Sequence, residues 1–130
     1  MARVTYRLPL PPTTNNLFAH YGSKRYINPQ YAAWLRAAGW ELQGQRAGSP
    51  CPLIEGDVQA IVLVRRPSKR ADLDNRLKAV FDLLVRQAVI RDDTQIVRIA
   101  AAWGDVEGCE VTVESVHEDA KPLASLETQA

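Results

Sequence analysis

A nearly continuous apolar run, Val-Gln-Ala-Ile-Val-Leu-Val at residues 58–64, constrains the fold of this chain more than any other segment. Its β-branched side chains favour a strand over a helix. Because the apolar residues do not alternate with polar ones, the run predicts a central strand that is covered on both faces. Such a strand needs other elements on and beside it, and the chain's 130 residues are enough for one domain with its own core.

Shorter segments on either side supply those other elements. Apolar and polar residues alternate in some of them at the period of a strand. Three further strands are predicted, over residues 3–9, 95–103 and 109–116. Asn28 and Pro29 form a typical helix start, and apolar residues at helical spacing continue this helix to about Gly44. The polar segment from Thr13 to Ile27 is expected to be a loop.

A second helix is predicted from Asp74 to about Gln87. Its expected core face consists of Leu77, Val80, Phe81, Leu84 and Val85. If the central strand and the strand at 95–103 are parallel, this helix forms a right-handed crossover between them. Glycines at positions 104 and 108 suit a hairpin between the last two strands.

The predicted order of elements is therefore β-α-β-α-β-β. This order is typical of an α+β fold in which helices pack on a small mixed sheet. We expect one domain over residues 1–116. Residues 117–130 contain few apolar side chains and are expected to form a flexible C-terminal tail.

The charge of the chain is nearly balanced, at +1 overall, so its total identifies no partner. The basic residues are densest in one short segment that contains Arg65, Arg66, Lys69 and Arg70. Cys51 and Cys109 lie far apart in the sequence and are expected to be reduced thiols. No apolar run approaches the ~20 residues that cross a bilayer, so we expect a cytoplasmic protein without a membrane segment.

Three acidic residues are the strongest candidates for chemistry. Asp72 and Asp74 are two positions apart in chain that should be extended, which would point both carboxylates the same way. Asp93 follows the second predicted helix. If all three meet, their oxygens form the kind of site that Mg²⁺ prefers, and a metal there would act on a phosphodiester. The sequence alone leaves open whether Asp93 reaches the other two.

Several neighbours of these acids suit the same chemistry. Lys78 lies one helical turn after Asp74 and would neutralise charge that develops on a phosphate or hold the attacking water. Asn75 would fix a metal-bound water, a carboxylate or the DNA. The basic segment directly before Asp72 is placed to hold a nucleic-acid backbone.

Each of these residues also has an ordinary structural explanation. Asp72 or Asp74 would serve as an N-cap of the second helix. Asp74 and Lys78 would form a surface ion pair, and Asp92 and Asp93 would be turn residues. The basic segment would be a solvated loop. Considered singly, each of these explanations outweighs the functional one. The joint occurrence of these residues in this order leaves a metal–phosphate site and the structural explanations equally open.

The order of these residues resembles that of a known family. The resemblance includes Arg70-Ala71-Asp72-Leu73-Asp74-Asn75, then Lys78, Phe81-Asp82 and Asp92-Asp93-Thr94-Gln95. The N-terminal segment Leu8-Pro9-Leu10-Pro11-Pro12-Thr13-Thr14-Asn15-Asn16 is similar as well. Together these segments resemble the RusA family of Holliday junction resolvases over residues 4–116.

The resemblance implies a small α+β domain that forms a homodimer and acts on four-way (Holliday) DNA junctions. It implies endonucleolytic cleavage by paired symmetric nicks, dependent on Mg²⁺, for which Mn²⁺ can substitute. The implied metal-binding and catalytic carboxylates are Asp72, Asp74 and Asp93, and Lys78 is the implied catalytic lysine. Asp92 would be the non-catalytic member of its pair. The residues expected to contact DNA are Arg65, Arg66, Lys69, Arg70 and Asn75.

Two positions depart from the pattern of the family. Ala71 stands where some relatives have a basic residue, and Trp103 occupies a region where relatives often have lysine. Both departures concern DNA affinity more than the metal site. A dimer suits the reaction because a junction has two-fold symmetry and needs two opposed nicks. The alternative function is a non-catalytic junction- or DNA-binding protein that keeps the carboxylates for structural reasons.

Overall fold

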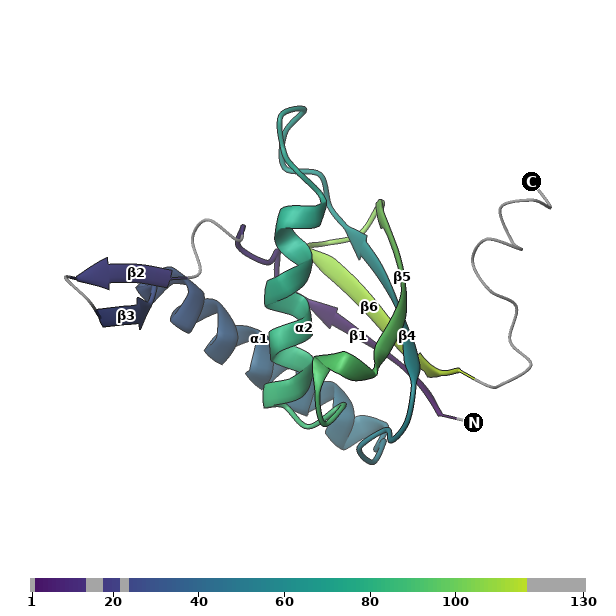
Figure 1. Cartoon of the computed structure of the whole chain (residues 1–130). Coiled ribbons are helices and arrows are strands. Elements are labelled where there is room, and N and C mark those ends of the chain that lie inside the picture. Colours follow the sequence, from purple (N-terminus) through teal and green to yellow (C-terminus); the bar gives the residue numbers. More distant parts are fainter. Residues whose placement is uncertain (1, 14–17, 22–23, 117–130) are drawn as a thin grey trace.

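The computed structural model describes residues 2–13, 18–21 and 24–116. The elements are β1 (Arg3–Leu8), β2 (Phe18–Tyr21), β3 (Lys24–Ile27), α1 (Pro29–Gly48), β4 (Val58–Val64), the 3₁₀ helix η2 (Asp74–Arg76), α2 (Leu77–Arg86), the 3₁₀ helix η3 (Asp93–Gln95), β5 (Ile96–Trp103) and β6 (Cys109–Ser115). They form a mixed sheet with two packed helices, which confirms the predicted α+β class (Figure 1). The predicted C-terminal tail at 117–130 lies outside the described residues.

The main sheet has the strand order β1-β6-β4-β5. Strand β4 pairs in parallel with β5 and antiparallel with β6, so α2 connects two parallel strands, as expected for a crossover. The hairpin predicted between the last two strands is wrong, because β4 lies between β5 and β6. The connection from β5 to β6 therefore passes over the end of β4. Within it, Gly108 (φ +84°) packs against the backbone at the end of β1. A Cβ there would lie 2.5 Å from the carbonyl oxygen of Leu8, so only glycine fits.

Strand β4 alternates in burial, in contrast to the expected cover on both faces. Val58, Ala60, Val62 and Val64 are fully buried, whereas Ile61 and Leu63 on the other face are only half-buried. The reason is that the buried residues of α1 and α2 belong to one core cluster on the same face of the sheet. The opposite face carries polar pairs, such as the hydroxyl groups of Thr5 and Thr112, which lie 2.8 Å apart.

Helix α1 starts as predicted. The side chain of Asn28 caps it by accepting a hydrogen bond from the Gln30 N–H at 2.8 Å, and Pro29 occupies the first turn. The helix continues past the predicted end at Gly44 to Gly48. Its last turn is held to β1, because the Gln45 side chain accepts from the Arg7 N–H and donates to the Arg7 carbonyl.

Residues 18–21 and 24–27, which fall in the predicted polar loop, form two strands instead. Strands β2 and β3 pair antiparallel, from Phe18↔Ile27 to Tyr21↔Lys24. This small hairpin extends from the body of the molecule at the N-terminal end of α1 (Figure 1). The signal that sequence reasoning missed is Gly22-Ser23, a dipeptide typical of two-residue hairpin turns, between two aromatic-rich segments.

The second helix is shorter than predicted and begins differently. A 3₁₀ turn over Asp74–Arg76 precedes α2, which ends at Arg86. Ala79, Val80, Leu83 and Leu84 are buried, whereas the other apolar residues of the helix are half-buried and form a stripe at i, i+4 and i+8: Leu77, Phe81 and Val85. No helix among the described residues is long and apolar enough to cross a membrane.

Candidate active site

Asp72 and Asp74 lie at the end of the loop that joins β4 to α2. Both are exposed, and the Asn75 side chain donates a hydrogen bond to Oδ2 of Asp72 at 3.1 Å. Leu73 between the two acids has helical dihedral angles (φ −71°, ψ −48°), so the prediction of extended chain here is wrong. Neither helix start has a side-chain cap, so the N-cap explanation for both aspartates is also wrong.

Asp93 begins the short helix η3, and its neighbour Asp92 caps that helix. The Asp92 carboxylate accepts from the Thr94 N–H at 2.9 Å. This N–H, and next the neighbouring Asp93 carboxyl, hold the pKa of Asp92 below its usual value. Asp92 therefore has a structural role, and the exposed Asp93 is the member of the pair that can serve a ligand.

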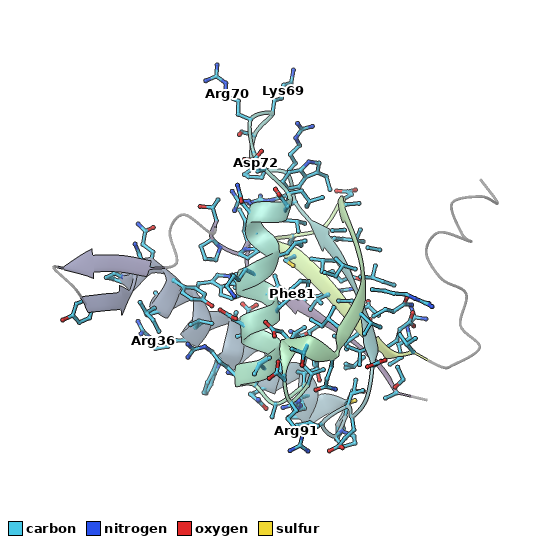
Figure 2. The ribbon with its side chains drawn as sticks, in the orientation of Figure 1. Arg36, Lys69, Arg70, Asp72, Phe81 and Arg91 are labelled. Atoms are coloured by element: carbon cyan, nitrogen blue, oxygen red, sulfur yellow. The ribbon has the colours of Figure 1, made fainter. Side chains whose placement is uncertain are left out.

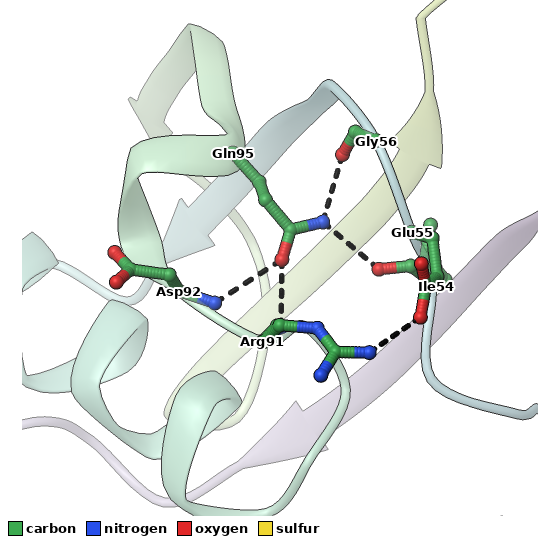
Figure 3. Close-up of polar contacts among 6 residues, drawn as sticks. All are labelled: Ile54, Glu55, Gly56, Arg91, Asp92 and Gln95. Atoms are coloured by element: carbon green, nitrogen blue, oxygen red, sulfur yellow. Dashed lines mark hydrogen bonds and ion pairs between the residues drawn. The ribbon is translucent and has the colours of Figure 1, made fainter.

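A network around Gln95 holds the turn that carries Asp93 (Figure 3). Its side-chain oxygen accepts from the backbone N–H groups of Arg91 (2.7 Å) and Asp92 (3.1 Å). Its amide nitrogen donates to the carbonyls of Ile54 (2.9 Å) and Gly56 (2.7 Å). The side chain thus joins the turn to the segment that leads into β4.

The acidic set, which consists of Asp72, Asp74 and Asp93, is divided between opposite ends of the molecule. Asp93 precedes β5, whose first residue pairs with the first residue of β4, whereas Asp72 follows the last residue of β4. A seven-residue strand spans about 20 Å. Figure 2 shows Asp72 and Arg91 (two residues before Asp93) beyond opposite ends of α2. Within the described residues, no three acidic, histidine or cysteine side chains come close enough to hold a metal ion.

Lys78 is bound to a different acid from the one considered in the sequence. Its ammonium nitrogen lies 3.8 Å from Asp82 on the next turn of α2. The other oxygen of Asp82 accepts a hydrogen bond from the buried Tyr31 hydroxyl at 2.8 Å. Burial, then this hydrogen bond, raise the pKa of Tyr31 well above its ordinary value. The carboxylate of Asp82 is therefore fixed by α1 and in turn restrains Lys78, a role signalled only by the i,i+4 spacing of the two residues.

The basic residues that were predicted to contact DNA lie in three different environments. Arg65 lines a groove of about 730 Å³ together with four acidic residues, namely Glu41, Asp105, Glu107 and Glu110. Arg66 folds back on its own loop. Lys69 and Arg70 project from the tip of that loop beyond Asp72 (Figure 2). The tip is therefore the part of the basic segment that is open to a large anion.

Residues 9–114 match the model of a family described as endodeoxyribonuclease RusA. The chain is 29% identical over 94 residues to a crossover junction endodeoxyribonuclease RusA from Aquifex aeolicus (strain VF5). That alignment covers 72% of this chain and 71% of the relative. The family match includes every residue of the acidic set.

Proposed function

Because the chain belongs to the RusA family of endodeoxyribonucleases, we propose that it resolves four-way DNA junctions by paired symmetric nicks that depend on Mg²⁺. One observation carries the proposal. Asp72 and Asp74 remain exposed beside a basic loop tip without capping a helix. Asp93 likewise stays exposed beside a neighbour that performs the capping.

The proposed metal ligands are Asp72, Asp74 and Asp93. Carboxylate oxygens are hard donors, and Mg²⁺ is usually held by one or two of them together with water and substrate phosphate oxygens. Asn75 supports this assignment because its amide holds one oxygen of Asp72 and leaves the other for a cation. When bound, Mg²⁺ would polarise the phosphodiester and lower the pKa of a bound water.

The chain's own residues have separate tasks in the proposed reaction. Lys69 and Arg70 bind backbone phosphates near the scissile bond by charge, which makes binding strongly dependent on salt. Lys78 stabilises negative charge on the phosphate that is attacked, and Asp82 keeps its ammonium group on that side of α2. Positioning of the phosphate and of these charges supplies the protein's share of the catalysis.

The separation of the acids supports a site that two chains complete together. Asp72 and Asp74 of one subunit would combine with Asp93 of the partner subunit. A two-fold axis across the middle of α2 and β5 would bring opposite ends of two chains together and create two equal sites. Those sites would be about as far apart as β4 is long, roughly 20 Å. Two equal sites related by a two-fold axis suit a junction that must be nicked twice.

The surface around β5 supports such an axis. β5 is the last strand in the sheet order, so its outer edge has no neighbouring strand within the described sheet. Val97 and Ile99 of β5 are 49% and 44% exposed. Exposed apolar side chains on an edge strand would favour aggregation of a monomer, so their exposure suits a strand that a partner subunit covers. The half-buried stripe of α2, identified above, has apolar area still to cover. We place the dimer contact on this surface.

The test uses purified protein, Mg²⁺ and labelled four-way junction, duplex and single-stranded DNA, with the nicks mapped to single nucleotides. We expect symmetric nicks in the junction only. Asp72→Asn and Asp93→Asn should abolish nicking but leave junction binding, whereas Asp92→Asn keeps the cap and should still nick. Binding without nicking in both Mg²⁺ and Mn²⁺ would instead establish the non-catalytic alternative, and cleavage by both site variants would refute the assignment.

A further inference from the structure

The loop that joins β4 to η2 is built around one side chain, Arg66. Its Nε donates to the carbonyl of Ser68 at 3.2 Å, and its Nη2 donates to the carbonyl of Lys69 at 2.8 Å. The guanidinium carbon lies 5.8 Å from the ring centroid of Trp103 on β5. One guanidinium group thus binds two successive carbonyls of its own loop and rests on an aromatic ring of the sheet.

The rest of the loop agrees with a fixed conformation. The Ala71 N–H donates to the Ser68 carbonyl at 3.2 Å, which closes a tight turn with Lys69 and Arg70 at its centre. The Arg70 N–H donates to the Ser68 hydroxyl at 3.3 Å. Pro67 restricts the chain between Arg66 and this turn. The side chains of Lys69 and Arg70 point away from the body (Figure 2).

The geometry separates Arg66 from its basic neighbours in function. Its planar fork of donors is directed at the loop's own carbonyls, so those donors are not aimed at an external phosphate. Within the described part of the chain, no hydrogen bond or ion pair involves the side chains of Lys69 or Arg70. Asp72 is two residues beyond Arg70, and two residues span at most about 7 Å of chain. The tip therefore sits next to the acidic half of the active site.

We propose that Arg66 is a positioning residue that, supported by Trp103, folds the loop into a fixed prong from which Lys69 and Arg70 bind the DNA phosphates beside the scissile bond. The DNA part rests on the proposed nuclease function. The folding of the prong by Arg66 does not. A prong that is ordered before binding avoids the conformational entropy that a flexible loop would lose on the DNA.

Arg66→Lys is the informative variant, because it keeps the charge but removes the fork of donors. In the free protein, we expect the amide of Ala71 to exchange with solvent about tenfold faster, since its turn opens more often. Trp103→Leu should have the same effect through the lost platform. Arg36→Lys, on the exposed face of α1, is the matched control and should leave this exchange unchanged.

Junction binding without Mg²⁺ tests the link to the tip. Arg66→Lys should weaken binding about fivefold in the otherwise unaltered chain. In a chain that also carries Lys69→Gln and Arg70→Gln, the same change should have less than about a twofold effect, because there is no charged tip left to position. A merely structural loss of stability would weaken both backgrounds equally.

The outcomes separate the two proposals. An equal loss in both backgrounds would overturn the positioning role, and so would unchanged exchange at Ala71. A different result would make Arg66 a direct phosphate ligand instead. In that case Arg66→Lys would bind the junction fully, whereas Arg66→Gln would bind more weakly and the dependence of its log affinity on log salt concentration would be lower by about one. If the unaltered chain bound no junction at all, the nuclease proposal would fail, while the exchange of Ala71 would still decide how the loop is built.

Discussion

Replacing Gln95 with alanine should weaken the whole domain and the proposed active site together. Its side chain makes four hydrogen bonds to backbone atoms on two sides of the network in Figure 3. Gln95 is half-buried, so water replaces part of what is lost, and we take about 0.5 kcal/mol for each bond. The expected loss in the free energy of unfolding is about 2 kcal/mol, which lowers the melting temperature by about 8 °C.

The assay is urea unfolding followed by circular dichroism, with nicking measured on the same preparations. Gln43→Ala is the control. It removes one exposed hydrogen bond to Gln87 on the surface and should stay within about 0.5 kcal/mol of the unaltered chain. Nicking should fall in Gln95→Ala at temperatures where it is still folded, because the turn that carries Asp93 is loosened. An unfolding free energy unchanged within 0.5 kcal/mol, or full nicking by the folded variant, would refute this account of the network.

Three further predictions follow from other parts of the structure. If the proposed dimer forms, Ile99→Glu should shift it to monomer in sedimentation equilibrium and reduce nicking. Trp40→Glu, at a residue of α1 that is 83% exposed, should do neither, and an Ile99→Glu variant that stays dimeric would exclude the proposed interface. Asp82→Ala should cost about 1–3 kcal/mol of unfolding free energy because it removes the charged acceptor of the hydrogen bond from the Tyr31 hydroxyl. Asp82→Asn keeps an acceptor and should cost less, and equal losses would argue against that hydrogen bond. Burial raises the pKa of the Cys109 thiol to about 12 from an ordinary value of 9.0, so the unfolded chain loses a proton that the folded chain keeps. The unfolding free energy should therefore decrease as the pH rises from 9.0 to about 12. Cys109→Ala should make this decrease smaller, which urea titrations at several pH values would measure.

Local patterns in the sequence predicted most of the sheet and the helices. The apolar run at 58–64 identified β4, and Asn28-Pro29 identified the start of α1, because both signals act within one element. Strand neighbours were harder to predict. β6 pairs with β1 and β4, and its inward residues are Cys109, Val111 and Val113. The choice between this interior place and a hairpin with β5 depends on burial across the whole sheet, which no short segment encodes.

The candidate site residues stand out in the sequence, whereas their arrangement in space does not. Asp72, Asp74 and Asp93 stand out by residue type and order, but their distances depend on how β4, α2 and β5 connect. Because β4 and β5 are parallel, the residue before β5 and the residue after β4 lie at opposite ends of the strand pair. The separation of Asp93 from Asp72 is thus a consequence of the crossover itself.

Roles that depend on contacts between distant segments could not be predicted. Arg66 looked like one of four equivalent basic residues, yet its position over Trp103 comes from the register Val64↔Trp103 between two strands. In the sequence, Asp82 stands out only as part of the family resemblance, yet the Tyr31 hydroxyl of α1 donates a hydrogen bond to it. Residue type suggested charge in each case, and only the tertiary structure shows where the charge is used.

The most direct test of the central claim mixes two inactive chains, Asp74→Asn and Asp93→Asn, and measures Mg²⁺-dependent nicking of a four-way junction. If each site combines Asp74 of one subunit with Asp93 of the other, the mixed dimer contains one site with both changes and one intact site. With free exchange of subunits at equal amounts, about a quarter of all sites become intact, so single nicks should reappear. If each chain built its own site, the mixed dimer would contain no intact site, and the mixture would stay as inactive as its components.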